Sequence, residues 1–265
     1  MIPPHERRIL EAHVRGIKLS KLALETRELN EYETSQLREL IKLRVRGVPL
    51  QYLTGTQAFY GRDFYVNTGV LIPRPETEGL VERVLSLLPP PVPGARLRGL
   101  ELGTGSGCIA LTLALERPDL WITATECESA ALAVAEENAA RLRVGNVDFL
   151  AVSESPAEWQ YGELPELDFL VSNPPYLVRA DAIAADVLEH EPHQALFVSE
   201  EDPIFFYRFL MDLMEHKVKA RGFGAFEIAE QRGGAIMELA RSRGFGVEIF
   251  KDLAGRDRYA VVRKP

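Results

Sequence analysis

The sequence predicts an α/β protein: a mostly parallel sheet of seven strands with helices on both faces, preceded by a small N-terminal helical domain. Two observations lead to this fold class. From about residue 97 onward, short apolar runs alternate with stretches of helical periodicity, and such alternation with short connections is typical of parallel strands. Between residues 6 and 46, few helix breakers occur and leucines recur at helical spacing.

Three segments of different character divide the chain. Residues 1–50 are predicted to form the helical domain, with Ser20 and Asn30 as helix N-caps. Residues 51–72 are predicted to be a linker that contains a β-hairpin, because aromatic and β-branched residues flank Gly61. Residues 73–265 carry the alternating pattern. This last segment begins with a helix that runs to about residue 88 and has Pro75 in its first turn.

Within the last segment, the apolar runs predict seven strands and the periodic stretches predict four further helices. The predicted strands are 97–102, 120–125, 147–151, 168–171, 224–228, 247–251 and 259–263. The predicted helices are 106–116, 130–142, 204–219 and 233–242. We expect the last two strands to pair with each other.

Charge is unevenly distributed along the chain. The net charge at pH 7 is −8, although residues 1–55 carry 10 Lys and Arg against 7 Asp and Glu. An acidic body is a poor platform for duplex nucleic acid, because neutralising phosphates supplies most of the non-specific affinity. We therefore expect no stable nucleic-acid binding. The basic excess at the N-terminus is interpreted as a solvated helical face, with a surface for RNA or an acidic partner as the alternative.

The sequence predicts neither a membrane protein nor a secreted one. No apolar run approaches the roughly 18 residues needed to span a bilayer, and the first eight residues lack the apolar core of a signal peptide. Cys108 and Cys127 are the only cysteines and do not have metal-ligand spacing. We expect a cytoplasmic protein with reduced thiols and no metal site. A metal site at His190, His193 and the glutamates beside them is the less favoured alternative.

A glycine-rich turn follows the first predicted strand of the sheet. Residues 101–107 read Glu-Leu-Gly-Thr-Gly-Ser-Gly, and such a turn lets a ligand approach the backbone and the free N–H groups of a helix start. The glycine spacing differs from the one that binds a dinucleotide pyrophosphate, and no Walker motif occurs. A purely structural turn is the alternative.

Two further polar features follow predicted strands. Glu126 ends the next strand, about 20 residues after the glycine turn, where a carboxylate can accept hydrogen bonds from two ribose hydroxyls. Residues 173–176 read Asn-Pro-Pro-Tyr after another apolar run. Neither proline has an N–H, and a residue before proline avoids the helical region. This rigid loop can aim the Asn173 amide and backbone carbonyls outward; a plain Pro-Pro turn is the alternative.

Together these features resemble the class I S-adenosylmethionine-dependent methyltransferases, which have a Rossmann-like fold. The resemblance implies that the glycine turn supports the methionine part of the cofactor and that Glu126 holds its ribose. In that family the Asn-Pro-Pro-Tyr loop marks members that methylate planar amino or amide nitrogens. The implied cofactor-binding residues are Gly103, Thr104, Gly105, Ser106, Gly107, Glu126, Ser153, Glu154 and Asn173.

The resemblance extends over essentially the whole chain. Residues 70–78 read Val-Leu-Ile-Pro-Arg-Pro-Glu-Thr-Glu, and Phe59-Tyr60-Gly61 precede them. This segment is similar to the signature of the protein-(glutamine-N5) methyltransferases, which modify the glutamine of the Gly-Gly-Gln motif in class 1 peptide chain release factors. The resemblance implies S-adenosyl-L-methionine as cofactor, S-adenosyl-L-homocysteine as product, a release factor as protein partner and a monomeric enzyme. The helical domain is then expected to recognise the substrate.

Glutamine chemistry explains the residues of the loop. The side-chain nitrogen is a poor nucleophile because its lone pair is delocalised, so its two N–H bonds are the handle available to an enzyme. The Asn173 oxygen and the Pro174 carbonyl can each accept one of them, and Tyr176 can pack on the amide plane. The expected catalytic residues are Asn173, Pro174 and Tyr176. The expected substrate-binding residues are Asn173, Pro174, Pro175, Tyr176, Leu71 and Arg74.

The chain departs from the family pattern at two places, and two other substrates stay open. Position 126 is Glu where the family usually has Asp, and Ser153-Glu154 stand where an acid and an aromatic often lie beside the adenine. The alternatives are a ribosomal-protein glutamine and an exocyclic amino group of a nucleobase. The second would call for a basic groove and an insertion that extracts the base. A non-enzymatic nucleoside-binding module does not explain the Asn-Pro-Pro-Tyr loop.

Overall fold

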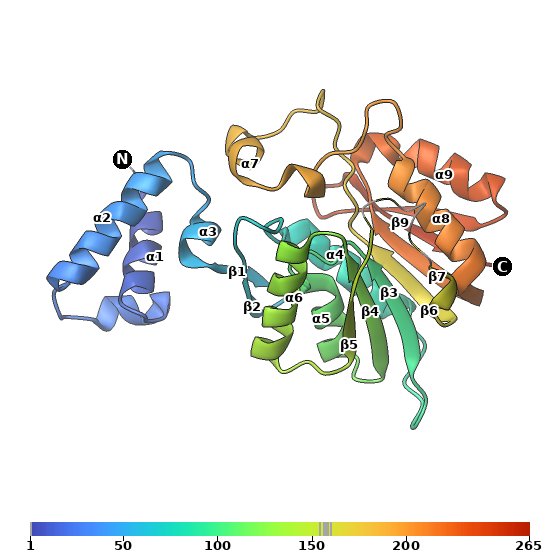
Figure 1. Ribbon diagram of the computed structural model, residues 1–265, viewed down its shortest axis with the longest axis horizontal. Coiled ribbons are helices and arrows are strands. Elements are labelled where there is room, and N and C mark those ends of the chain that lie inside the picture. Colours follow the sequence, from blue (N-terminus) through green and yellow to red (C-terminus); the bar gives the residue numbers. More distant parts are fainter. Residues whose placement is uncertain (1, 154, 156–158, 160) are drawn as a thin grey trace.

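The computed structural model describes residues 2–153, 155, 159 and 161–265. Its centre is a seven-stranded sheet with the strand order β5-β4-β3-β6-β7-β9-β8, seen nearly edge-on in Figure 1. Neighbours from β5 to β7 are parallel, whereas β9 is antiparallel to both β7 and β8. The predicted fold class is confirmed: the sheet is mostly parallel, and it carries the Rossmann-like order with an antiparallel strand near one edge.

The strands lie close to the predicted ranges. They are β3 (Leu97–Leu102), β4 (Leu120–Glu126), β5 (Val147–Ala151), β6 (Leu167–Ser172), β7 (Val218–Glu227), β8 (Gly246–Lys251) and β9 (Asp257–Arg263). The largest difference is in β7, which begins six residues before the predicted start. Val218 pairs with Leu167 across an irregular register. The residues that follow, Lys-Ala-Arg-Gly, interrupt the apolar run and hide this first part of the strand from a periodicity argument.

Helices cover both faces of the sheet and bury two separate apolar clusters. Phe169 and Val171 of β6 belong to the cluster under α4 (Pro75–Leu87) and α5 (Cys108–Glu116). Leu170 points to the opposite cluster, which α8 (Phe205–Lys217) and α9 (Gly233–Ser242) cover. Alternate residues of one strand thus feed both clusters, as the period-2 geometry of a strand requires. Helix α6 (Ser129–Leu142) packs beside β4 and β5 on the α4–α5 face.

The N-terminal helices lie to one side of the sheet, beyond the β1–β2 hairpin (Figure 1). They are α1 (Pro4–Val14), a 3-10 helix (Leu19–Leu24), α2 (Glu31–Val45) and α3 (Leu50–Thr54). Asn30 caps α2 as predicted, in a capping box with Glu33. The prediction for Ser20 is wrong: it lies inside the 3-10 helix, whose N-cap is Lys18. Arg44 of α2 forms an ion pair with Glu6 of α1 that joins the two helices.

The hairpin and its flanking loop connect these helices to the sheet. Strands β1 (Thr56–Phe59) and β2 (Arg62–Tyr65) turn at Tyr60-Gly61, both with positive φ. The Tyr52 hydroxyl of α3 donates to the carbonyl of Val70, 2.6 Å away. The N-terminal helices are therefore tied to the loop that precedes α4. The division into segments at residues 50 and 72 stays a prediction.

Candidate active site

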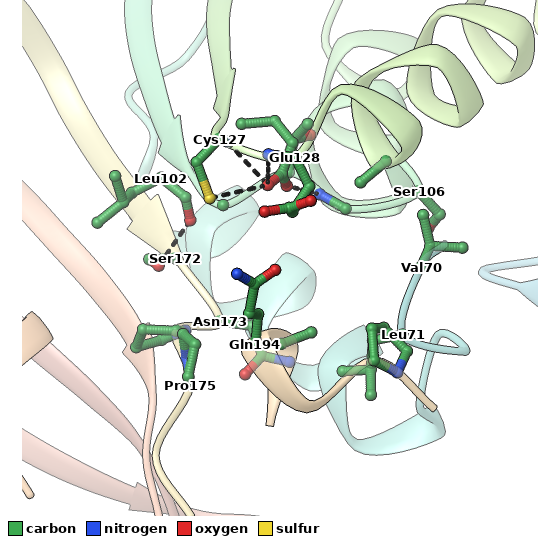
Figure 2. A pocket seen from close by; sticks show the side chains of 18 of the residues that line it. Val70, Leu71, Leu102, Ser106, Cys127, Glu128, Ser172, Asn173, Pro175 and Gln194 are labelled. Atoms are coloured by element: carbon green, nitrogen blue, oxygen red, sulfur yellow. Dashed lines mark hydrogen bonds between the residues drawn. The ribbon is translucent and has the colours of Figure 1, made fainter. Parts of the chain in front are cut away.

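A cavity of about 470 Å³ opens at the carboxyl ends of β3, β4 and β6. The chain runs outward from β3 to β4 and β5 and then returns to β6 on the other side of β3. In open α/β sheets this reversal point is where ligands bind. Figure 2 shows the cavity with Cys127 and Glu128 on one side, Leu71 and Val70 on another, and the Asn173 side chain rising between them.

The glycine turn forms the cavity wall beside β3. Gly103, Thr104, Gly105 and Ser106 line the cavity, and Gly103 and Gly105 have φ values of +71° and +55°. Those conformations are rarely adopted by residues with a side chain. A Cβ at either glycine would meet nothing within 4 Å, so the backbone is open for a ligand to approach. Gly107, also with positive φ, is the N-cap of α5 and is not among the lining residues.

Glu126 folds back onto backbone N–H groups at the end of β4. Its Oε2 accepts a hydrogen bond from the Gly105 N–H at 2.8 Å, and its Oε1 accepts from the N–H groups of Cys127 and Glu128 at 2.9 and 3.1 Å. Figure 2 draws these bonds beside Cys127. Glu126 has one methylene more than the Asp that is usual in the family. Its side chain accommodates that length by bending over the glycine turn. Glu126 lines the cavity. Within the described part of the chain, its Oε2 accepts only the Gly105 bond and keeps a lone pair for a ligand hydroxyl, whereas Oε1 already accepts from two backbone N–H groups.

Glu101, the first residue of the turn, is a fully buried acid on the cavity wall. Its Oε2 accepts from the Thr104 hydroxyl at 2.6 Å and from the Ala110 N–H at 3.2 Å. Its Oε1 has no hydrogen-bond partner among the described residues. Burial raises the pKa of Glu101 to about 8, against the opposing effect of its hydrogen bonds. A cationic ligand group beside this carboxyl would favour its ionised form and lower its pKa.

Asn138, on α6, is a structural residue of the site that the sequence argument missed. Its Nδ2 donates to the carbonyls of Ser106 and Tyr65, and its Oδ1 accepts from the Tyr65 N–H at 2.7 Å. One buried amide therefore joins the glycine turn, the hairpin and α6. An Asn in the middle of an Ala-rich helix was the available signal, because a polar residue on a buried face needs partners.

The Asn-Pro-Pro-Tyr loop begins directly after β6. Asn173, Pro174 and Pro175 line the cavity, and the Ser172 hydroxyl holds the strand end by donating to the Leu102 carbonyl at 2.8 Å. The Asn173 amide points into the middle of the cavity (Figure 2). Its Nδ2 donates to the Thr77 hydroxyl at 3.3 Å. The glycine turn, Glu126 and Asn173 are therefore brought to one cavity from three strand ends.

Tyr176 is placed differently from the other residues of the loop. It is not among the described residues that line the cavity. Its ring packs against the apolar cluster under α8 and α9, and its hydroxyl donates to Glu227 Oε1 at 3.1 Å. The structure does not bring it to the expected place of an amide plane, because Glu227 at the end of β7 holds it on the sheet side.

The opposite wall is built by the loop before α4 and by the segment after α7 (Ala185–His190). Leu71 and Arg74 line the cavity as predicted candidates, and so do Pro192 and Gln194. Buried Glu191 joins the two segments: its Oε1 accepts from Arg74 at 2.6 Å and its Oε2 from the Ile72 N–H at 3.1 Å. Arg74 therefore helps to hold the two segments of this wall together through its ion pair with Glu191. From the sequence, this segment was considered as the less favoured place for a metal site.

The comparisons with known proteins agree with this geometry. The family model "PrmC N-terminal domain" matches residues 2–55, and "Methyltransferase small domain" matches residues 83–197. The release factor glutamine methyltransferase of Koribacter versatilis is 42% identical over 241 residues, which are 90% of this chain and 83% of that protein. The Bacillus cereus protein of the same name is 36% identical over 255 residues, 94% of this chain and 89% of that protein. The chain belongs to the release factor glutamine methyltransferase family.

A solved structure supports the fold independently. The crystal structure of a methyltransferase from Pyrococcus furiosus is 18% identical and has a TM-score of 0.56, covering 87% of this chain and 98% of that one. At this identity the likeness concerns the fold alone.

Of the two remaining predicted cofactor residues, one lies on the wall of the cavity. Ser153 lines it together with Val152 and Trp159, whereas Glu154 lies outside the described residues. The assignment of Ser153 and Glu154 to the adenine stays a prediction. In the described part of the chain, no group of three His, Cys, Asp or Glu residues is arranged to hold a metal ion. No helix in that part is both long and apolar enough to cross a membrane.

Proposed function

We propose that this enzyme transfers a methyl group from S-adenosyl-L-methionine to the side-chain nitrogen N5 of the glutamine in the Gly-Gly-Gln motif of class 1 peptide chain release factors. The observation that carries the proposal is the position of Asn173. Its amide stands in the same cavity as the glycine turn and Glu126, so a nitrogen acceptor and a methyl donor can meet there. The names of the relatives support the release factor as substrate.

The cavity residues fit S-adenosyl-L-methionine group by group. The open glycines Gly103 and Gly105 leave room for its amino-acid part, and the partnerless oxygen of Glu101 suits its ammonium. Glu126 lines the cavity and has a lone pair on Oε2 for a hydroxyl of the ribose. When bound, the cofactor supplies a methyl group that its positively charged sulfur activates, and S-adenosyl-L-homocysteine is the product.

The residues of the loop act on the acceptor. Asn173 Oδ1 and the Pro174 carbonyl each accept one N–H of the glutamine amide, which orients its nitrogen toward the donor side of the cavity. Such positioning can supply about 7–11 kcal/mol of a barrier. The two acceptors also stabilise the positive charge that develops on the nitrogen. The proton leaves after the new N–C bond has formed, so no side chain of the cavity acts as a strong base before attack.

The surroundings of the cavity complete the proposal. Residues 1–50 recognise the protein substrate. Tyr52, which follows them closely, binds the carbonyl of Val70 in the cavity wall and so keeps this domain beside the cavity. The enzyme is a cytoplasmic monomer without a stable nucleic-acid partner. The net charge of −8 supports the absence of a stable nucleic-acid partner, because a strongly acidic protein repels phosphate.

The test is a methyl-acceptor assay with labelled S-adenosyl-L-methionine. A class 1 release factor, the same factor with the motif glutamine changed to alanine, ribosomal proteins, DNA and RNA are offered in parallel. We expect label only in the unmodified factor, with mass spectrometry placing one methyl group on the motif glutamine. Label in ribosomal protein, DNA or RNA, and none in the factor, would contradict the proposal.

A further inference from the structure

Behind the cavity, four side chains from distant parts of the sequence form one hydrogen-bonded chain. Asn173 Nδ2 donates to Thr77 Oγ1 at 3.3 Å, and the Thr77 hydroxyl donates to Glu227 Oε2 at 2.7 Å. Tyr176 donates to the other oxygen of Glu227 at 3.1 Å. Thr77 lies on α4, Glu227 ends β7, and Asn173 and Tyr176 belong to the loop after β6. The Asn173 side chain points into the cavity (Figure 2), and Thr77 lies at the cavity wall.

The chemistry of these groups fixes the direction of the chain. An ionised carboxylate can only accept hydrogen bonds, so Glu227 requires the single hydroxyl proton of Thr77. The Thr77 oxygen then has only lone pairs left for Asn173, and only the NH₂ end of an amide can donate to it. Glu227 thereby turns Asn173 Oδ1 away from Thr77 and toward the cavity. Asparagine by itself has no such preference, because the two ends of its amide are nearly the same size.

Burial makes this direction costly to reverse. Thr77 is 2% exposed and Glu227 is 1% exposed, and a buried polar group that loses its hydrogen-bond partner is destabilising because no water replaces the partner. Burial raises the pKa of Glu227, while the bonds from Thr77 and Tyr176 and the charge of Arg258 act in the opposite direction. The carboxylate therefore has two donors and a nearby cation in its support, and Glu76 on α4 is the acid that opposes it.

We propose that Thr77 and Glu227 are positioning residues that set the acceptor specificity of the enzyme, by holding the Asn173 amide with its oxygen toward the substrate. An oxygen in that place attracts an N–H of glutamine and repels the carboxylate of glutamate, which has the same shape. The inference rests on the proposed function and extends it from where the acceptor binds to how it is discriminated.

The decisive variant is Thr77→Val, with Thr77→Ser as the conservative partner. Valine keeps the shape and β-branching of threonine but removes the hydroxyl, so the Asn173 amide loses its orienting bond. Serine restores it. The matched control is Thr112→Val on α5, because Thr112 is equally buried and its hydroxyl has no partner among the described residues. Each variant is assayed for methylation of a release factor, for affinity for S-adenosyl-L-methionine and for thermal stability.

We expect Thr77→Val to lower kcat by about 10- to 100-fold, the equivalent of one misplaced buried hydrogen bond. Affinity for the cofactor should stay within threefold, and Thr77→Ser and Thr112→Val should stay near the wild type. The specific readout is inhibition by a release factor whose motif glutamine is glutamate. It should bind at least fivefold more tightly to Thr77→Val than to the wild type, because the freed amide can turn its NH₂ toward the carboxylate.

Two outcomes would overturn the inference while leaving the proposed function intact. One is a fully active Thr77→Val enzyme, and the other is an equal loss in Thr77→Val and Thr77→Ser with no change in glutamate binding. If Thr77→Val does not fold, Thr77→Ala is measured in the same way against Thr112→Ala. A wild-type enzyme that leaves the release factor unmethylated would contradict the proposed function and this inference with it.

Discussion

The cavity has two halves that are built by different means. The donor half, residues 101–107 with Glu126, is made of left-handed glycines and of a carboxylate that rests on neighbouring N–H groups. The acceptor half, Asn173 with Thr77 and Glu227, is made of side chains that meet from three distant elements. The donor half therefore depends on local backbone shape, whereas the acceptor half depends on the packing of α4 against the sheet.

Each half contains a buried acid, and the two acids differ in how completely they are paired. Both oxygens of Glu227 accept hydrogen bonds from side chains. Glu101 has one oxygen without a partner among the described residues and a pKa raised to about 8. A protein with marginal stability retains a poorly paired buried acid only at a cost. The acceptor half is thus complete in itself, and the donor half is completed by a ligand.

The largest effect is expected when the acceptor half loses the amide of Asn173. Asn173→Ala should lower kcat by about 100- to 1,000-fold, the range found when one preorganised transition-state contact is removed. Affinity for S-adenosyl-L-methionine should change less than threefold. Steady-state methylation of a release factor and calorimetric titration of the cofactor measure the two quantities. A loss of cofactor binding as large as the loss of turnover would show that the halves are not separate.

Replacing the titratable Glu101 by glutamine should change how the free energy of unfolding depends on pH. Its pKa is raised from 4.5 to about 8 in the fold. The folded state therefore holds the proton more tightly than the unfolded state, and the contribution to stability is full below pH 4.5 and is lost as the pH rises toward 8. From pH 5 to 8, wild type should lose roughly 3 kcal/mol relative to Glu101→Gln, at about 1.4 kcal/mol per pKa unit.

Urea denaturation of both proteins without cofactor at pH 5, 6.5 and 8 tests the Glu101 prediction. Other titrating groups are common to the two proteins and cancel in the difference. Glu136→Gln, at an exposed position of α6, serves as the control and should run parallel to the wild type at all three pH values. If the curve for Glu101→Gln also ran parallel to that of the wild type, the pKa of Glu101 would not be raised in the folded protein.

In the donor half, Glu126→Ala should weaken binding of S-adenosyl-L-methionine by about 10- to 100-fold, because a charge-assisted hydrogen bond to the ribose is lost together with the bond that holds the Gly105 N–H. Turnover at saturating cofactor should stay within fivefold of the wild type. Glu126→Gln keeps one acceptor oxygen for the backbone, so its affinity for S-adenosyl-L-methionine should lie between those of the wild type and Glu126→Ala. Unchanged cofactor affinity in Glu126→Ala would show that Glu126 does not bind the cofactor.

The smallest effect is expected from a single methyl group on the glycine turn. Gly103→Ala introduces a strained positive φ of +71° and a Cβ on the cavity side, and should weaken cofactor binding about tenfold and cost about 1 kcal/mol of stability. Gly255→Ala is the matched control: its φ is +80° and a Cβ there also meets nothing within 4 Å. Both variants should lose similar stability, but only the first should lose affinity.

The same division explains how much of the molecule the sequence could predict. The glycine turn, Glu126 and the Asn-Pro-Pro loop are each contained in a few consecutive residues, so periodicity and turn chemistry were sufficient to place them at strand ends. The seven strands and the helices on both faces followed from the same periodicity. Where polar and glycine residues interrupt a strand, as Lys219, Arg221 and Gly222 do directly after Val218 in β7, that signal was absent.

The acceptor half was only partly predictable. Thr77 and Glu227 are 150 residues apart, and nothing local indicates that α4 and the end of β7 meet behind Asn173. For the same reason the direction of Tyr176 could not be predicted, because the buried acid that holds its hydroxyl lies on another element. Asn138 and Glu191 are similar cases: each is a buried polar residue whose partners are known only from the fold.

Single-turnover methyl transfer in Asn173→Ala and Glu126→Ala tests the separation of the two halves most directly. Each enzyme is first saturated with labelled S-adenosyl-L-methionine, with occupancy checked by filtration, and is then mixed with a release factor. We predict transfer at a rate within fivefold of the wild type for Glu126→Ala, and at least 100-fold slower transfer from equally occupied Asn173→Ala. Equal rates for the two saturated variants would contradict the account.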